Sequence, residues 1–175
     1  GGKVDKALLA EAVALLRQEE TVALGYREGD PDVQDFPLNP DAAATCLEFE
    51  RPIGSSDLSP HLGELPEGYR LLRMDAALLQ GSPHHAATLR RYGSLENFLG
   101  KGISVCILQG DDVACEAYAD MDICGTRELG ISTQKPYWGQ GLATIACAHL
   151  IRLCEEAGAH TYWDCVRLNA GSRTL

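Results

Sequence analysis

Long apolar runs, a Cys-x-x-C motif and an excess of basic residues are all missing from this sequence. No apolar stretch approaches the roughly 18 residues that a membrane-spanning helix needs. No charged-then-apolar segment of the secretory type opens the chain. The seven cysteines lack metal-ligand or paired spacing, which argues against a zinc site or a disulfide framework and favours buried thiols in a reducing compartment. We therefore expect a cytoplasmic location, no membrane partner and no bound metal.

The negative charge is unevenly distributed along the chain. The net charge of −10 divides into −8 for residues 1–66 and −2 for residues 67–175. Nucleic-acid binding needs a basic face, so we expect no nucleic-acid partner. An acidic surface favours a cationic, amine-bearing substrate, although a general solubility charge explains the same numbers.

Two glycines, Gly139 and Gly141, stand between a short strand and an apolar helix that runs to Gly158. Glycine permits positive φ and leaves its N–H uncovered by any Cβ. The first N–H groups of a helix lack internal partners and carry the positive end of the helix dipole, so this stretch favours a bound anion. The residues concerned are Trp138, Gly139, Gln140, Gly141, Leu142 and Ala143.

Two better-known phosphate motifs are excluded. No Gly-Lys-Ser/Thr follows at the spacing of a magnesium-nucleotide site. Thr144 stands where the dinucleotide fingerprint needs a third glycine or alanine. Taken alone, the glycine pair also fits an ordinary turn.

Two further blocks flank the glycine loop. They are Glu128-Leu129-Gly130-Ile131-Ser132-Thr133 before it and Trp163-Asp164-Cys165-Val166-Arg167-Leu168-Asn169-Ala170-Gly171-Ser172 after the helix. In this order the blocks resemble the GNAT superfamily of acyl-CoA-dependent N-acetyltransferases, in the branch with Glu-x-Gly-Ile-x-Thr and Trp-Asp-x-x-x-x-Asn-x-x-Ser. The resemblance covers residues 66–175.

The pattern and the resemblance agree on an α/β (α+β) fold, in which helices flank a mixed, mostly antiparallel sheet. Alternating apolar residues and turn signals predict a hairpin with strands at 103–108 and 113–121. Ser94 is the expected N-cap of a short helix, and His84 and His85 are expected to be exposed. Further strands are predicted at residues 69–74, 128–133 and 161–166, and helices at residues 76–80 and 83–92.

Residues 1–65 are expected to form a small N-terminal extension or subdomain. An amphipathic helix is predicted over residues 4–20, followed by turn-rich acidic sequence. A short strand is predicted at residues 45–50, before a proline-rich linker.

The resemblance implies roles for particular residues. The pantetheine arm of the coenzyme would pair with the backbone of Ile131 and Thr133, and its pyrophosphate would lie on the N–H groups of residues 138–143. Asn169 and, one turn later, Ser172 would reach the coenzyme arm. Pro136 and Trp138 depart from the usual Gln/Arg-x-x-Gly-x-Gly/Ala form, so the backbone cradle remains while a side-chain phosphate contact is lost.

The implied chemistry is direct attack of a neutral amine on the thioester of acetyl-CoA. An alkylamine has a pKa near ~10.4 and is mostly protonated at neutral pH, so a base is useful. Glu128 is the first candidate, followed by Asp120 and Asp122. In related enzymes the chain continues past the position of Leu175, and a tyrosine there often acts as the acid, so we expect these residues to be a fragment.

Alternative functions remain open at this point. The chain could keep the coenzyme cradle as a catalytically silent acyl-CoA-binding or regulatory module. It could also be an interaction domain whose acidic N-terminal segment binds a partner. A small-molecule or peptide amine is the expected acceptor, and a homodimer is possible.

Overall fold

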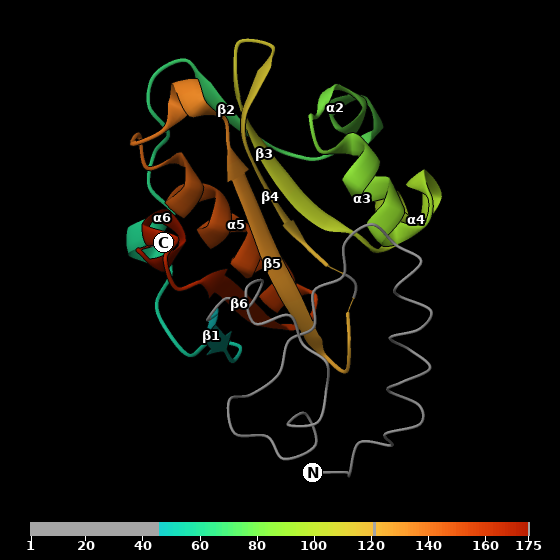
Figure 1. Ribbon diagram of the computed structural model, residues 1–175, viewed down its shortest axis with the longest axis vertical. Coiled ribbons are helices and arrows are strands. Elements are labelled where there is room, and N and C mark those ends of the chain that lie inside the picture. Colours follow the sequence, from blue (N-terminus) through green and yellow to red (C-terminus); the bar gives the residue numbers. More distant parts are fainter. Residues whose placement is uncertain (1–45, 121, 175) are drawn as a thin grey trace. The chain divides into compact units, whose positions relative to one another are not determined.

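The computed structural model describes residues 46–120 and 122–174, so the helix predicted over residues 4–20 lies outside the described residues. The described chain contains six strands, with three short helices between β2 and β3 and the long helix α5 between β5 and β6 (Figure 1). In order, the elements are β1 (Cys46–Arg51), η2 (Ser59–His61), β2 (Tyr69–Arg73), α2 (Ala76–Gly81), α3 (His85–Tyr92), α4 (Leu95–Lys101), β3 (Ile103–Gln109), β4 (Asp112–Ala119), β5 (Thr126–Thr133), η3 (Lys135–Tyr137), α5 (Leu142–Glu156), β6 (His160–Val166) and α6 (Ala170–Arg173).

The strands form one sheet in the order β1-β6-β5-β4-β3-β2. All neighbouring strands are antiparallel except β5 and β6, which run parallel. The expected mixed, mostly antiparallel sheet flanked by helices is therefore confirmed. β1 falls inside the region assigned to the N-terminal extension, yet it is the edge strand of this sheet and pairs with β6 from Cys46↔Val166 to Arg51↔Thr161.

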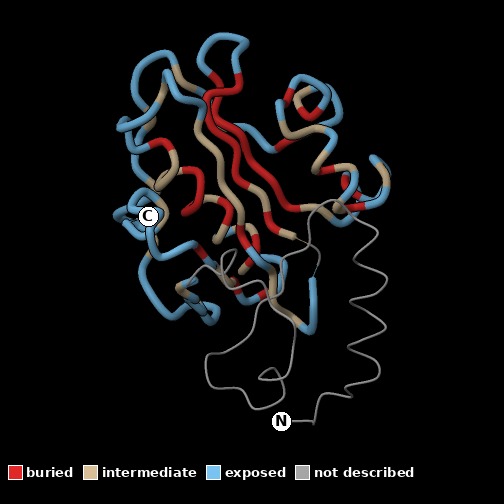
Figure 2. Tube along the Cα trace, in the orientation of Figure 1, coloured by how far each residue is buried: buried red, intermediate tan, exposed pale blue. Residues whose placement is uncertain are grey.

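Alternating side chains of the central strands fill two separate cores, because successive residues of a strand point to opposite faces. On one face, Val105, Ile107 and Ala117 pack against α5. On the other face, Cys106 and Leu108 pack beneath the short helices α2, α3 and α4. Figure 2 shows the buried residues running along the middle of the sheet.

The short helices are held by their ends. Asp75 caps α2 by accepting a hydrogen bond from the Leu78 N–H at 2.8 Å. Ser94 caps α4 by accepting one from the Asn97 N–H at 3.1 Å, so the predicted N-cap is confirmed. The caps fix where the chain leaves β2 and returns to β3.

Within the described residues, no helix is both long and apolar enough to cross a membrane.

Candidate active site

The parallel strands β5 and β6 separate part of the way along the sheet. Their pairing ends at Glu128↔Tyr162. Beyond this point β5 continues to Thr133, while β6 stays paired with β1 as far as Val166. The edge of β5 that faces β6 is therefore unpaired from the Leu129 carbonyl onward.

The register of β4 and β5 decides which backbone groups face this opening. The Asp120 N–H donates to the Glu128 carbonyl at 2.8 Å, and the Gln134 N–H donates to the Ala114 carbonyl at 2.9 Å. In an antiparallel ladder the hydrogen-bonded residues alternate, so the even-numbered residues of β5 face β4. The N–H and C=O groups of residues 131 and 133, and the C=O of residue 129, consequently face the opening, where an extended ligand can pair with them.

Ile131 and Thr133, the two predicted pairing residues, thus have the orientation that the prediction requires. The Thr133 carbonyl already accepts a hydrogen bond of 2.6 Å from the Trp138 indole Nε1, which agrees with its pointing away from β4. Trp138 as a whole is 64% exposed. Trp138 therefore lies over the outer end of the open edge.

The opening leads to the N-terminus of α5. Gly139 and Gly141 both have positive φ, at 76° and 75°. A Cβ on either glycine would meet no atom within 4 Å, so the loop surface is open. Gly141 is the N-cap and brings no side-chain cap, and Ile145 makes the bond from its N–H to the Gly141 carbonyl. The N–H groups of the first turn of α5, from Leu142 to Thr144, thus have no helical partner and are free to bind an anion.

The predicted loop residues do not all contribute in the same way. The Trp138 N–H donates to the Lys135 carbonyl at 3.3 Å, so it is already engaged in η3. Leu142 is 1% exposed, so only its backbone can reach a ligand. Gln140 is exposed and accepts a hydrogen bond of 2.7 Å from the Tyr69 hydroxyl, which ties the loop to β2. Ala143 is partly exposed on the first turn of α5.

Asn169 and Ser172 lie together at the last described helix. Asn169 is the N-cap of α6, and its side-chain oxygen accepts from the Ser172 N–H at 3.2 Å. Ser172 lines an apolar cavity of about 240 Å³ whose walls include Leu129, Cys147 and Trp163. The cavity therefore adjoins the first residue of the open edge.

Glu128 stands at the last paired residue before the opening. Partial burial raises the pKa of its carboxyl above the usual value, and the nearby charges of Asp164 and Asp120 raise it further, while Arg91 opposes them. A raised pKa brings a carboxylate closer to the range where it accepts protons at neutral pH. The other two candidate bases are engaged: Asp120 pairs with Arg91 Nε at 2.6 Å, and Asp122 accepts from the Gly125 N–H at 2.8 Å.

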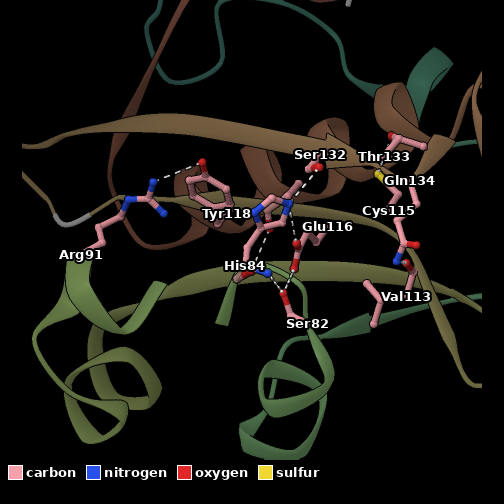
Figure 3. A network of polar contacts seen from close by, with 12 residues as sticks. Ser82, His84, Arg91, Val113, Cys115, Glu116, Tyr118, Ser132, Thr133 and Gln134 are labelled. Carbon is pink, nitrogen blue, oxygen red and sulfur yellow. Dashed lines mark hydrogen bonds and ion pairs between the residues drawn. The ribbon is translucent and has the colours of Figure 1, made fainter. Parts of the chain in front are cut away.

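A polar cluster on the α2–α4 face of the sheet was not anticipated from the sequence. Glu116 on β4 is 4% exposed, and its Oε2 accepts a hydrogen bond of 2.7 Å from the Ser82 hydroxyl. His84 Nε2 lies 3.4 Å from the other carboxylate oxygen and 3.1 Å from the Ser132 hydroxyl (Figure 3). The His84 side chain nevertheless keeps 43% of its surface exposed, so the expectation of exposure is met in part, while its polar partners were not predicted.

This cluster has a Ser, a His and a Glu but not the geometry of a hydrolytic triad. In a triad the serine and the carboxylate bind different ring nitrogens, so that the imidazole relays a proton between them. Here Ser132 and Glu116 both lie against Nε2 of His84. The cluster instead ties the α2–α3 junction to β4 and β5, and so fixes one wall beside the open edge.

The sequence was compared with models of protein families and with curated proteins. A family model described as GNAT acetyltransferase matches residues 40–175. A search of curated proteins gave no match. Within the described residues, no group of three or more His, Cys, Asp or Glu side chains has the arrangement of a metal site.

Several solved structures share the fold. A GCN5-related N-acetyltransferase-like protein from Streptococcus suis has a TM-score of 0.61 and 24% identity, over 74% of this chain and 55% of that one. A tandem GNAT protein from the clavulanic acid biosynthesis pathway has a TM-score of 0.66 and 12% identity, over 97% of this chain and 63% of that one. An acetyltransferase from Colwellia psychrerythraea has a TM-score of 0.53 and 10% identity, over 75% of this chain and 50% of that one. The chain thus spans between half and two thirds of these proteins.

Proposed function

Because the chain belongs to the GNAT acetyltransferase family, we propose that it transfers an acetyl group from acetyl-CoA to a primary amine by direct attack of the amine on the thioester. The observation that carries this proposal is that two sets of unpaired backbone groups, one on β5 and one at the start of α5, lie next to each other along the chain. The open edge of β5 leads directly to the bare N-terminus of α5. An extended amide chain fits the first surface, and a pyrophosphate fits the second.

Each surface has a defined task in this proposal. Ile131 and Thr133 hold the pantetheine arm along β5, and the N–H groups from Gly139 to the first turn of α5 hold the pyrophosphate. Asn169 and Ser172 approach the arm from α6.

Glu128 removes a proton from the attacking amine. Its position at the mouth of the opening and its raised pKa both support this role. The neighbouring charges of Asp120 and Asp164 also favour an acceptor that arrives as a cation. The acceptor is therefore proposed to be an amine, either a small molecule or a peptide.

The experiment that tests this function measures acetyl-CoA consumption by the wild-type protein and by Glu128→Gln with a panel of primary amines. We expect turnover by the wild type and a loss of about 10²-fold or more in kcat for the variant, the usual contribution of a general base. Calorimetry should give the same Kd for acetyl-CoA in both proteins. Glu67→Gln, an exposed carboxylate before β2, is the matched control and should behave as the wild type.

Two outcomes would contradict the proposal in different ways. Binding of acetyl-CoA without turnover of any amine, unchanged in Glu128→Gln, would indicate a silent acyl-CoA-binding module. Failure to bind acetyl-CoA at all would remove the cradle assignment as well.

A further inference from the structure

The phenol ring of Tyr118 crosses β5 at a position that only glycine can occupy. Tyr118 on β4 pairs with Gly130 on β5. A Cβ on Gly130 would lie 2.2 Å from Cζ of the Tyr118 ring and 2.4 Å from its hydroxyl oxygen. No side chain fits at that separation. The far end of the phenol therefore rests directly on the β5 backbone.

This contact places the Tyr118 hydroxyl beside the start of the opening. Gly130 lies between Leu129, whose carbonyl is the first unpaired group of the edge, and Ile131, whose N–H and C=O both face the opening. In the proposed function the thioester lies where the edge of β5 becomes unpaired, and the pantetheine arm continues from it along Ile131. The hydroxyl is thus next to the place of the sulfur atom.

Arg91 orients the Tyr118 hydroxyl. Its Nη2 donates a hydrogen bond of 3.2 Å to the Tyr118 oxygen, and its Cζ lies 4.2 Å from the ring centroid (Figure 3). The oxygen therefore acts as an acceptor toward Arg91, and among the described residues its own proton has no acceptor. The guanidinium also lies beside the place where negative charge develops on the oxygen as the proton leaves. Asp120, paired with Arg91 Nε at 2.6 Å, holds the guanidinium in place.

The other described tyrosines are less suited to this task. Tyr162, opposite Glu128, lies among carboxylates, and burial together with Glu48, Asp164 and Glu128 raises its pKa to about 12. Tyr92 is buried and donates to the Ala119 carbonyl. The remaining two, Tyr69 and Tyr137, donate to Gln140 and Asp112 at the loop end of the sheet.

We propose that Tyr118 is the acid that protonates the leaving thiolate, a role that rests on the proposed function. The amine nitrogen forms a bond to the thioester carbonyl carbon, and the excess proton on nitrogen passes to the Glu128 carboxylate. The carbon–sulfur bond then breaks, its electron pair goes to sulfur, and the Tyr118 O–H proton moves to that sulfur. The amide and the free thiol leave. Glu128 then gives its proton to water, and the Tyr118 phenolate takes one back from water.

The test compares two acetyl donors on the wild type and on Tyr118→Phe. One donor is acetyl-CoA. The other is an aryl thioester, in which a pantothenic acid amide ends in a thiophenol that carries the acetyl group. The thiophenolate is a good leaving group and departs without being protonated. We expect Tyr118→Phe to lower kcat by about 10²-fold with acetyl-CoA and by less than about threefold with the aryl thioester. Phenylalanine keeps the ring over Gly130, so Tm and the calorimetric Kd for acetyl-CoA should stay at wild-type values.

Two further variants keep the test decisive. Arg91→Gln should show the same dependence on the leaving group, because it removes the cation beside the oxygen. Tyr162→Phe should lose no more activity with acetyl-CoA than with the aryl thioester. An equal loss with both donors in Tyr118→Phe would overturn the proposal in favour of a structural role. Selective loss in Tyr162→Phe would assign the acid to that residue instead.

Failure of this inference is distinguishable from failure of the proposed function. If the wild type acetylates amines and Tyr118→Phe is unaffected with either donor, only the acid assignment fails. If the wild type transfers no acetyl group from either donor, the proposed function itself fails.

Discussion

Glu128 is placed among negative charges, and this arrangement has a measurable consequence for the pH dependence of the reaction. A base works when it is deprotonated, so kcat/KM should rise as the pH passes through the raised pKa of Glu128. Asp164 is the larger of the two charges that raise this pKa. Asp164→Asn should therefore lower the pKa and move the acidic limb of the pH profile to lower pH.

A matched control separates this local effect from a change of total charge. Asp111→Asn, in the turn between β3 and β4, removes the same charge far from Glu128 and should leave the acidic limb in place. An acidic limb that is unmoved by Asp164→Asn would show that another group titrates in the reaction. Measuring kcat/KM against pH for the three proteins decides between the two.

Substitutions at the glycines that flank α5 can separate the effect of backbone strain on stability from the effect of a side chain on acetyl-CoA binding. Gly141→Ala and Gly158→Ala both place a Cβ on a residue in the left-handed region, with φ of 75° and 77°. Neither Cβ would meet an atom within 4 Å. Each should lower the free energy of unfolding by about 1 kcal/mol. Gly141→Asp should in addition abolish acetyl-CoA binding, because it puts a carboxylate where the pyrophosphate lies.

Urea unfolding and calorimetry measure the two effects independently. Gly158→Ala, at the far end of α5, should keep the wild-type Kd for acetyl-CoA. Wild-type affinity in Gly141→Asp would show that the anion binds elsewhere.

At the scale of elements, helix α5 joins the loop to the sheet. Its buried residues Leu142, Ala146, Leu150 and Cys154 recur every fourth position and face the central strands. Leu150 is fully buried, so Leu150→Ala should lower the free energy of unfolding by about 2–5 kcal/mol. Arg152→Ala, on the exposed face, should change it by less than about 0.5 kcal/mol.

Denaturant unfolding of both variants checks this expectation. A small effect of Leu150→Ala would mean that the sheet and α5 do not share one cooperative core.

The elements also show what a sequence can and cannot predict. The anion loop was predictable because its causes are local: two glycines, a strand before them and an apolar helix after them. The contact between Tyr118 and Gly130 was not, because it exists only once β4 and β5 pair in one register, and no nearby residue fixes that register. The same reason explains why the polar contacts of His84 were not predicted. Its partners Glu116 and Ser132 come from two strands that follow it much later in the chain.

At the scale of the whole molecule, the cysteines report on how completely the fold excludes solvent. Cys46 and Cys124 are exposed, and the other five are buried. Burial raises the pKa of four of the buried thiols, to about 11 for Cys106, Cys115 and Cys154 and to about 12 for Cys147. A thiol reacts as its thiolate, so these groups should be inert in the native state.

Iodoacetamide should therefore label two of the seven cysteines quickly and the rest only after denaturation, as peptide mass spectrometry can determine. Rapid native labelling of Cys147 or Cys154 would instead reveal that α5 opens away from the sheet.

The position of β1 determines when the sheet can be completed during synthesis. Arg51 on β1 and Thr161 on β6 touch across 110 positions of sequence. On the ribosome β1 emerges early and then has to wait, without its neighbour, until β6 has been translated. A chain that stops after α5 would leave β1 with no place in the sheet and the whole outer edge of β5 exposed, so prematurely terminated products should aggregate.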